Sequence, residues 1–523
     1  MHSLVTRLRA TERSRWWTTF VLTAALCSLW SLATPLFAAP DEPAHAIRSA
    51  SVSRLEILGD EDEHFEDALV VDAPRGYAEL GGDVSCFAFM RNVPASCASF
   101  PDESPMARVP TSAGRHPPAY YLVAGIPSLV FHGPLGIYLM RVVSTLLTAA
   151  FVASSVITLE RLRSPRLGAL AILLVATPML FFVGGVVNPS AAEIPAALCL
   201  WVAGFALVSE APTHIDRRLV RRVAVAAIVL VLSRQLAPLW LGLIALALLG
   251  IARSGASRAL WEHHRARRWG AAVVVATVAQ LAWIAIVRPL DPELGDSAAV
   301  RGLSTGSAFR MSLGETLNRL REMIGWFGWL DAPSPGMTYA LWTLAFGIVL
   351  ALAVVLARRR VLLVASAVAV LAVAAPIAFE TVQAHRIGFF WQGRYSMPLA
   401  IGVPVLLALG AAAEAPTRDA LGRARLGWLL PTVGLLVGVA SVAAYGQALR
   451  RNTVGYDGPL DFLIDPIWSP PIPALVLMLA TIVVTAAFVA WVATPVADAG
   501  DDEHAAAAEP YERSIPSGSH RYS

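Results

Sequence analysis

The residues best suited to chemistry lie near the N-terminus, in residues 37–45, which read Phe-Ala-Ala-Pro-Asp-Glu-Pro-Ala-His. Asp41 and Glu42 are adjacent carboxylates between two prolines that stiffen the backbone, and His45 follows three residues later. A carboxylate in a fixed position can act as a general base toward a hydroxyl group. We therefore predict that Asp41, Glu42 and His45 are catalytic. The alternative is that both acids only mark the end of a membrane helix.

Two arginines later in the chain are candidates for binding a phosphate. Arg394 lies in residues 391–398, Trp-Gln-Gly-Arg-Tyr-Ser-Met-Pro, and arginine binds phosphate through paired hydrogen bonds. The alternative for Arg394 is an anchor at the membrane interface. Arg234 lies between two short apolar segments, and charges at membrane depth usually face an interior cavity. Further candidates for substrate binding are Gln392, Tyr395, His116, Tyr120 and His385.

The composition indicates the kind of protein that must position these residues. The 523 residues are 56% hydrophobic and only 15% charged, whereas soluble domains average about 45–50% apolar and about 25% charged residues. We therefore expect a polytopic membrane protein whose partner is the lipid bilayer. The net charge of +3 gives no indication of a nucleic-acid partner. The sequence contains no glycine-rich phosphate loop, no Cys or His metal cluster and no Gly-x-Ser-x-Gly motif, so a nucleotide-driven pump is unsupported.

The apolar runs predict an all-α fold of about 12 transmembrane helices with a large first extracytoplasmic loop. We expect a cytoplasmic N-terminus (1–15), a first transmembrane helix (16–37), and an extracytoplasmic loop (38–134) that contains the acidic motif and a short re-entrant or interfacial helix. A multi-span domain (135–494) follows, with external loops near 289–336, 380–396 and 447–471, and then a disordered cytoplasmic tail (495–523).

Arginine clusters set the expected orientation. Arg7, Arg9, Arg13 and Arg15 precede the first apolar run, and the later short Arg clusters fall on the same side as these residues. Because Arg-rich flanks stay in the cytoplasm, we expect a multi-pass cell-membrane protein with both termini cytoplasmic. A cleaved signal peptide is the alternative for the first run, which is long for a signal core.

The first predicted external loop contains two cysteines and an acidic cluster. Cys86 and Cys97 should face the oxidising side, so we predict a disulfide between them, with two free thiols as the alternative. Residues 61–67, Glu-Asp-Glu-His-Phe-Glu-Asp, suit a solvated loop or a divalent-cation site. We assign no metal ligands from the sequence, and the cofactor stays undetermined.

Four motifs together resemble the bacterial membrane-protein family known as domain of unknown function 2142. They are Pro-Asp-Glu-Pro-x-His (40–45), His-Pro-Pro-x-Tyr-Tyr (116–121), Asn-Pro-Ser (188–190) and Gln-Gly-Arg-Tyr-x-x-Pro (392–398). The resemblance covers roughly residues 15 to 450. Members of this family commonly have Asp after Asn-Pro, where this chain has Ser190, and this difference weakens a catalytic role for that turn.

That family in turn resembles the GT-C glycosyltransferases, which use polyprenyl-phosphate sugars as donors. The resemblance implies an inverting transfer of a sugar to a cell-envelope acceptor on the extracytoplasmic face. It implies that Asp41 or Glu42 is the base and that Arg394, together with Arg234, holds the lipid phosphate. Two alternatives remain open, a transporter or flippase of lipid-linked glycans and a non-catalytic envelope assembly subunit. The oligomeric state is not predicted.

Overall fold

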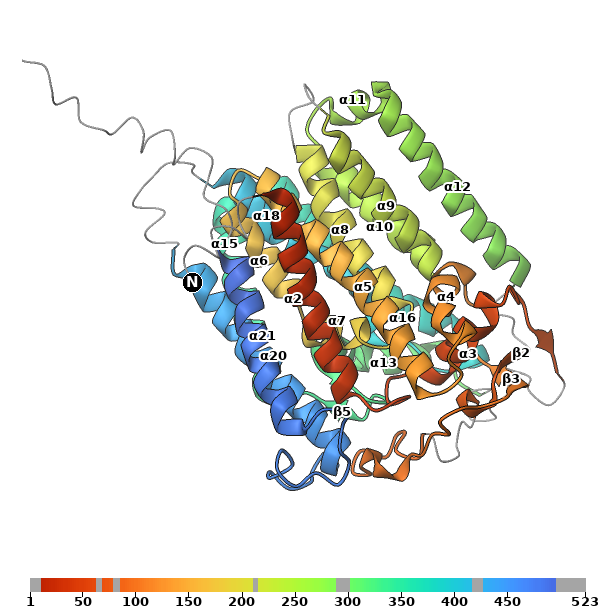
Figure 1. Cartoon of the computed structure of the whole chain (residues 1–523). Helices are drawn as coiled ribbons and strands as arrows, with labels where there is room; N and C mark the ends of the chain where they lie inside the picture. Colours follow the sequence, from red (N-terminus) through yellow and green to blue (C-terminus); the bar gives the residue numbers. More distant parts are fainter. Residues whose placement is uncertain are drawn as a thin grey trace, which may run out of the picture.

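The computed structural model describes residues 11–62, 68–78, 85–209, 215–287, 302–415 and 427–494. The predicted tail (495–523), most of the predicted N-terminal segment and much of the acidic cluster lie outside these described residues. The described chain forms a bundle of long helices, with a smaller mixed region at one end (Figure 1).

Within the described residues, nine helical segments are long and apolar enough to cross a membrane. They are α2 (Glu12–Ala33), α5 (Pro134–Thr158), α8 (Ser190–Ser209), α12 (His264–Val287), α15 (Gly336–Leu356), α16 (Arg359–Ile387), α17 with α18 (Gly393–Ala400 and Gly402–Glu414), α20 (Leu429–Val454) and α21 (Ala474–Ala493).

Two bent helix pairs raise the number of candidate spans to at most 11 among these residues. They are α6 (Pro165–Val175) with α7 (Pro178–Gly184), bent by 67°, and α10 (Ala237–Ile251) with α11 (Ala256–Glu262), bent by 118°. The first bend falls before Pro178, because the residue that precedes a proline disfavours the helical conformation. The all-α polytopic class is confirmed, whereas the predicted count of about 12 spans is not.

Helix α8 lies at the centre of the bundle. In the most apolar stretch of α8, 94% of the residues are buried inside the protein, whereas in that of α12 only 11% are buried. α8 packs against α5, α10, α18 and also α9 (Arg217–Ser233), and α12 lies at the rim (Figure 1). The exposed apolar side chains of the outer helices are therefore the surface that lipid would cover.

The two ends of the bundle differ in charge. At one end, which we call the arginine face, Arg161, Arg218 and Arg222 lie around Glu12 at the start of α2. At the other end, the Asp41 face, α2 ends at Ala33 and α3 (Glu42–Ser53) follows. With 20 residues α8 joins the two faces and is about 30 Å long, which matches the apolar thickness of a bilayer.

A small antiparallel sheet covers the Asp41 face, in the order β1 (Asp60–Glu61), β2 (Leu69–Pro74), β3 (Met106–Thr111). The sequence analysis did not predict this sheet. The register pairs Val71 with Val109, and both side chains pack in one buried cluster with Ile47 of α3. The short turns η1 (Arg75–Tyr77) and η2 (Ala95–Cys97) lie between β2 and β3 in the chain.

The predicted short helix before residue 134 consists of α4 (Pro118–Ala124) and the 3-10 turn η3 (Ile126–Leu129). The break falls at Gly125, where an added Cβ would lie 1.9 Å from the carbonyl oxygen of Ser49. Only glycine allows α4 to approach α3 this closely, and α3 carries the acidic turn at its start. A further 3-10 turn, η4 (Leu159–Arg161), ends α5 on the arginine face.

The loop predicted near residues 289–336 contains α13 (Thr305–Gly314) and α14 (Thr316–Gly325), which precede a short hairpin of β4 (Trp326–Phe327) and β5 (Ala332–Pro333). Several leucines of α13 and α14 are exposed, as an interfacial element requires. Trp329 in the hairpin loop donates its indole N–H to the carbonyl oxygen of Phe37, at 3.0 Å. The hairpin therefore supports the chain just before Asp41.

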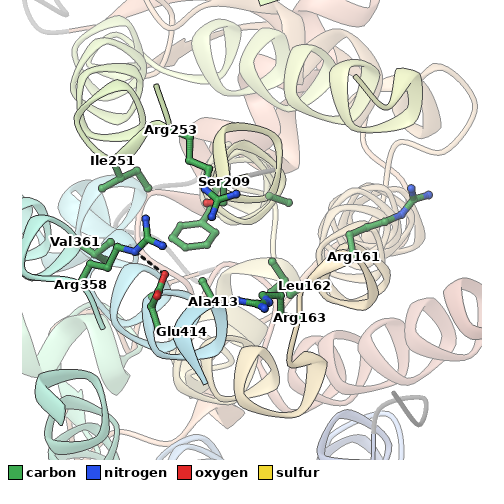
Figure 2. Close-up of a pocket in the computed structure, with 13 residues that line it drawn as sticks. Arg161, Leu162, Arg163, Ser209, Ile251, Arg253, Arg358, Val361, Ala413 and Glu414 are labelled. Carbon is green, nitrogen blue, oxygen red and sulfur yellow. Dashed lines mark ion pairs between the residues drawn. The ribbon is translucent and has the colours of Figure 1, made fainter. Parts of the chain in front are cut away.

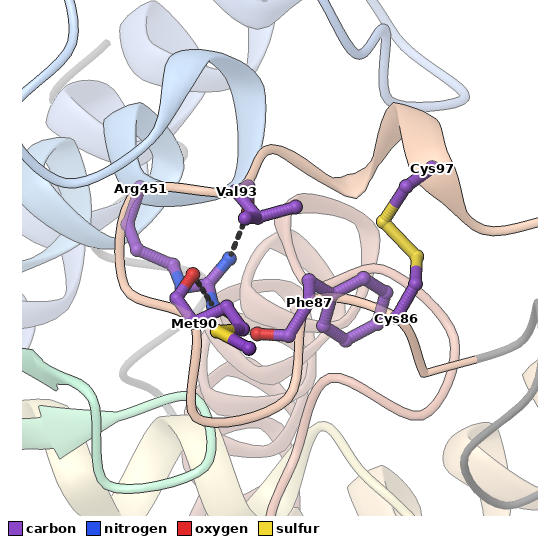
Figure 3. Close-up of a disulfide and its surroundings, with 6 residues drawn as sticks. All are labelled: Cys86, Phe87, Met90, Val93, Cys97 and Arg451. Carbon is purple, nitrogen blue, oxygen red and sulfur yellow. Dashed lines mark hydrogen bonds between the residues drawn. A yellow bond between two sulfur atoms is a disulfide. The ribbon is translucent and has the colours of Figure 1, made fainter.

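A disulfide joins Cys86 and Cys97, with Cα atoms 6.1 Å apart. Arg451, near the end of α20, donates to the carbonyl oxygens of Phe87 (2.8 Å) and Val93 (3.0 Å) inside this disulfide loop (Figure 3). Arg451 also pairs with Asp331 at 2.5 Å. A single buried arginine thus connects the segment between β2 and β3 to the last part of the helix bundle.

Candidate functional site

The acidic turn is anchored by Glu42, which is fully buried. Its carboxylate accepts hydrogen bonds from Arg141 Nε (2.7 Å) and Nη2 (2.6 Å), and from the backbone N–H groups of Phe37 and Val187 (both 3.0 Å). Each oxygen therefore has two donors. Because these partners occupy both oxygens, the Glu42 carboxylate holds the turn in place and has little capacity left for a substrate.

Arg141 is a structural residue that the sequence analysis missed. It lies on α5, is fully buried, and also donates to the carbonyl oxygens of Ser31, Thr34 and Pro35 at the end of α2. Ser31 lies in the last turn of α2, and Thr34 and Pro35 directly follow the helix, where backbone acceptors lack helical partners. The sequence does contain an indication of Arg141, because a single arginine inside an apolar run usually faces the protein interior. The sequence analysis selected Arg234 for the same reason.

Asp41 differs from its neighbour in environment and in backbone conformation. Its φ is +63°, in the left-handed region that aspartate tolerates better than most residues. Its side chain is 40% exposed, and Oδ2 accepts a hydrogen bond from Arg394 Nη2 at 2.5 Å. The two residues are 353 positions apart in the chain. The structure thus brings together the acid and the arginine that the sequence analysis assigned to one site.

The Arg394 segment is held by two acids from other elements. The backbone N–H of Trp391 donates to Glu380 of α16 at 3.0 Å, and that of Gly393 donates to Glu322 of α14 at 2.5 Å. Burial raises the pKa of Glu322. Gly393 is required here, because a Cβ would lie 2.3 Å from the carbonyl oxygen of Arg319. This packing fixes the start of α17, where Arg394 emerges.

Tyr395 brings the two predicted arginines together. The guanidinium carbon of Arg234 lies 4.6 Å from the centre of the Tyr395 ring, and that of Arg394 lies 5.0 Å from it. Cation–π contacts of this kind orient a guanidinium group over an aromatic face. Arg234 reaches this point from the turn between α9 and α10, and both arginines are buried. The site therefore concentrates two positive charges around one aromatic ring.

Glu193 adds a third acidic group that the sequence analysis did not select. It lies in the first turn of α8, is 1% exposed, and interacts electrostatically with Arg234 and Arg394. Its Oε2 has no hydrogen-bond partner among the described residues. The available signal was an acidic residue three positions after the Asn-Pro-Ser turn, at the start of a buried apolar helix.

His45 and His116 lie close enough to Arg234 to interact with it electrostatically. Nδ1 of His45 is 2.9 Å from the Tyr121 hydroxyl, and the two imidazole rings are 5.5 Å apart in an edge-to-face arrangement. Burial lowers the pKa of His45 well below its usual value, and the nearby positive groups lower it further. Burial likewise lowers the pKa of His116 to about 3. Both rings are therefore neutral at neutral pH.

The other predicted substrate-binding residues are placed less centrally. The Tyr120 hydroxyl is 2.7 Å from Ser144 Oγ on α5, so its polar group is already bound. Gln392 occupies the position before α17, and its Oε1 is buried without a partner among the described residues. His385 is exposed near the end of α16.

The central feature of the site is a set of unpartnered polar atoms. Five buried polar atoms have no hydrogen-bond partner within the described chain. Their side chains interact electrostatically through Arg234 and Arg394. The five atoms are Nε of Arg234, Nε of Arg394, Oε2 of Glu193, Nε2 of His45 and Nδ1 of His116. An unsatisfied buried polar group costs about 1–3 kcal/mol. Such a cluster suits a polar, anionic ligand that would supply the missing partners.

No metal centre is evident in the parts of the chain that the structure covers. Among those residues, no group of three or more His, Cys, Asp or Glu side chains is placed to hold a metal ion. Glu61, at the edge of the acidic cluster, is paired with Arg115 at 3.1 Å, and residues 63–67 lie outside the described chain.

The fold and the site together define a polytopic membrane protein with a buried, charged cluster at one membrane face. The chain belongs to the DUF2142 family of predicted membrane proteins, whose model matches residues 25–403. The crystal structure of ArnT from Cupriavidus metallidurans in the apo state is similar over 92% of this chain and 78% of its own, with 14% sequence identity and a TM-score of 0.39. The comparison with curated proteins finds no match.

Proposed function

We propose that this protein is a membrane glycosyltransferase that transfers a sugar from a polyprenyl-phosphate donor to a cell-envelope acceptor on the extracytoplasmic face. The observation that carries the proposal is the contact between Asp41 and Arg394, with Arg234 stacked on the same tyrosine. An acid that can accept a proton and two cations that can bind a phosphate are the groups that such a transfer needs.

Two observations support placing the Asp41 face outside the cytoplasm. The Cys86–Cys97 disulfide lies on this side, and disulfides persist in oxidising compartments. The opposite face carries clusters of arginines, including Arg161, Arg218 and Arg222, and such clusters are retained in the cytoplasm. Under this orientation the site opens toward the cell envelope.

In the proposed reaction, the Asp41 carboxylate takes the proton from an acceptor hydroxyl as its oxygen attacks the anomeric carbon of the donor. The bond between that carbon and the phosphate oxygen breaks, and its electron pair stays on the phosphate. Arg394 and Arg234 stabilise the leaving phosphate through charged hydrogen bonds. A single displacement of this kind inverts the anomeric carbon.

The ion pair between Asp41 and Arg394 suggests an order of binding. In the structure Arg394 already occupies Oδ2 of Asp41, so this oxygen is not free to accept the proton of a hydroxyl group. A donor phosphate would bind Arg394 in place of Asp41 and would free Oδ2 to accept the hydroxyl proton. The donor would therefore bind before the acceptor is activated.

Asp41 is the better candidate for the base than Glu42. The side chain of Asp41 is 40% exposed and has one ion-pair partner, whereas that of Glu42 is completely enclosed by four donors. His45 would assist through Nε2, which is free to contact a substrate hydroxyl when Tyr121 bonds to Nδ1. These roles rest on the positions of the groups.

The proposal is tested with membranes that contain the Asp41→Asn variant, assayed for transfer from radiolabelled polyprenyl-phosphate sugars to a cell-envelope fraction. Loss of a general base lowers the rate by about 10²–10⁴-fold, and we expect a loss in this range. Asp457→Asn is the control, because the Asp457 side chain is 61% exposed and its carboxylate contacts only the surface residues Arg91 (3.5 Å) and Asn92 (3.1 Å) among the described residues. Full activity in Asp41→Asn, or movement of the lipid without covalent change, would contradict the proposal.

A further inference from the structure

A second cavity lies at the arginine face, far from the site described above. Its volume is about 360 Å³, and it is enclosed by the ends of α8, α10 and α18, the start of α16, and residues 161–163 (Figure 2). α8 begins at Ser190 on the Asp41 face and ends at Ser209 in this cavity. The length of α8 therefore separates the two sites by about the thickness of a bilayer.

The cavity is rich in positive charge. Four arginines and one acid line it: Arg161, Arg163, Arg253, Arg358 and Glu414. Arg358 pairs with Glu414 at 2.7 Å, as the dashed line in Figure 2 shows, and Arg161 pairs with Asp216. In the described part of the chain, no ion pair involves Arg163 or Arg253. Two guanidinium groups are therefore available at one cavity.

The rest of the lining is apolar or small, and comes chiefly from Leu162, Phe205, Ile251, Val361 and Ala413. A cavity with a charged rim and an apolar wall suits an anion that carries an organic group. Arginine binds phosphate oxygens through paired N–H donors and also packs against apolar surface with its stem. The size of the cavity is appropriate for a head group and too small for a folded partner.

We propose that this arginine-lined cavity binds a phosphate ester, with Arg163 and Arg253 as the principal phosphate ligands. The phosphate belongs either to the head group of an anionic lipid or to a soluble organic phosphate. Both sources present the same chemistry to the cavity. The inference rests on the cavity and its charges and is independent of the proposed glycosyl transfer.

The experiment uses the purified full-length protein and two probes. The lipid arm compares thermal unfolding in nanodiscs of phosphatidylglycerol with that in nanodiscs of phosphatidylcholine, and counts retained phosphatidylglycerol by native mass spectrometry. The soluble arm titrates glycerol 1-phosphate into the detergent-solubilised protein by calorimetry. We expect one arm to show binding: retained phosphatidylglycerol identifies a lipid head group, and a calorimetric signal identifies a soluble ester.

Three variants connect binding to the cavity. Arg163→Gln with Arg253→Gln should weaken binding by at least about tenfold, as expected for the loss of charged hydrogen bonds. Ala413→Leu keeps every charge but fills part of the cavity, and should also weaken binding. Arg258→Gln is the control, because Arg258 is 85% exposed on α11 and does not line the cavity.

Three results would overturn this proposal. The first is that neither probe binds the wild-type protein above the phosphatidylcholine background. The second is that Arg258→Gln weakens binding as much as the double variant, which would indicate a diffuse surface charge. The third is that Ala413→Leu, folded by its thermal transition, binds the probe as well as the wild-type protein, which would place the phosphate outside the cavity.

Discussion

Asp41 and Glu42 are adjacent in the chain but lie in opposite environments. The Asp41 side chain is 40% exposed and meets Arg394, whereas the Glu42 side chain is fully buried and is bound by Arg141. The left-handed backbone at Asp41 turns the two carboxylates apart. One acid thus remains available for chemistry because the other is committed to holding the turn.

Glu42→Gln should destabilise the protein far more than Asp41→Asn. Removing one partner of a buried ion pair leaves an uncompensated charge and costs about 3–5 kcal/mol, here on Arg141. The measurement is thermal unfolding in detergent, with Glu262→Gln as the control, since Glu262 forms an exposed pair within one helix. A Glu42→Gln variant that is inactive but as stable as the wild-type protein would instead assign Glu42 a direct catalytic role.

Two substitutions of Tyr395 should distinguish the contribution of its ring from that of its hydroxyl group. Tyr395→Leu removes the ring on which Arg234 and Arg394 lie. In the proposed transfer it should raise the donor KM by about 5- to 30-fold, the equivalent of two cation–π contacts at about 0.5–1 kcal/mol each. Tyr395→Phe keeps the ring and loses only a 3.4 Å contact with Arg394, so its KM should change little. Equal losses in both variants would show that the hydroxyl group, and not the ring, positions the arginines.

Acid should destabilise the protein below about pH 6.5, the pKa of an unperturbed histidine. The folded-state pKa of His45 and His116 is lowered by burial, to about 3 for His116, so the unfolded chain binds protons first as the pH falls. The two neutral histidines make their full contribution to the free energy of unfolding above pH 6.5. Below this pH, each histidine loses up to about 1.4 kcal/mol of that contribution per pH unit.

Chemical denaturation of the protein at pH 7.5, 6.0 and 5.0 measures this slope. His116→Gln should reduce the slope by the contribution of one histidine. His132→Gln serves for comparison, because His132 lies outside the site and contacts Arg54. An unchanged slope in His116→Gln would mean that other groups cause the acid sensitivity.

Cys86→Ser with Cys97→Ser should destabilise the protein by about 2–3 kcal/mol, because a short disulfide loop restricts the unfolded chain by that amount. The folded loop should stay docked, since Arg451 binds its carbonyl groups directly. Thermal unfolding with and without dithiothreitol provides the measurement, and Cys199→Ala controls for the loss of a cysteine that forms no disulfide. A reductant that leaves the wild-type transition unchanged would argue against a structural role of the bond.

Much of the bundle was predictable, because long apolar runs in water-free surroundings must form helices. The convergence of Asp41, Arg234 and Arg394 was also inferred, because each charge lies where an apolar run ends. The contributions of Arg141 and Glu193 were not inferred, since each depends on which helices are neighbours in space. The choice between Asp41 and Glu42 depends on Arg141, which lies 99 residues after Glu42.

The sheet was missed for a different reason. β3 reads Met-Ala-Arg-Val-Pro-Thr, which contains a proline and has little of the alternation that marks a strand. Its pairing with β2 is stabilised by the shared apolar contact of Val71 and Val109 with α3. The span count differs from 12 for two reasons. Two candidate spans are bent helix pairs, at 67° and 118°, and helix α9, which covers the apolar segment before Arg234, has only 17 residues and is not counted among the candidate spans.

The 353-residue separation of Asp41 and Arg394 has a consequence for biosynthesis. At a translation rate of about 5–20 residues per second, Asp41 waits on the order of 20–70 s at the translocon before its arginine partner is synthesised. Glu42 meets Arg141 within about 5–20 s. The nascent protein therefore pairs Glu42 with Arg141 early and completes the charged cluster late, so a ribosome stalled before codon 394 would leave the acidic turn formed but Asp41 without its arginine partner.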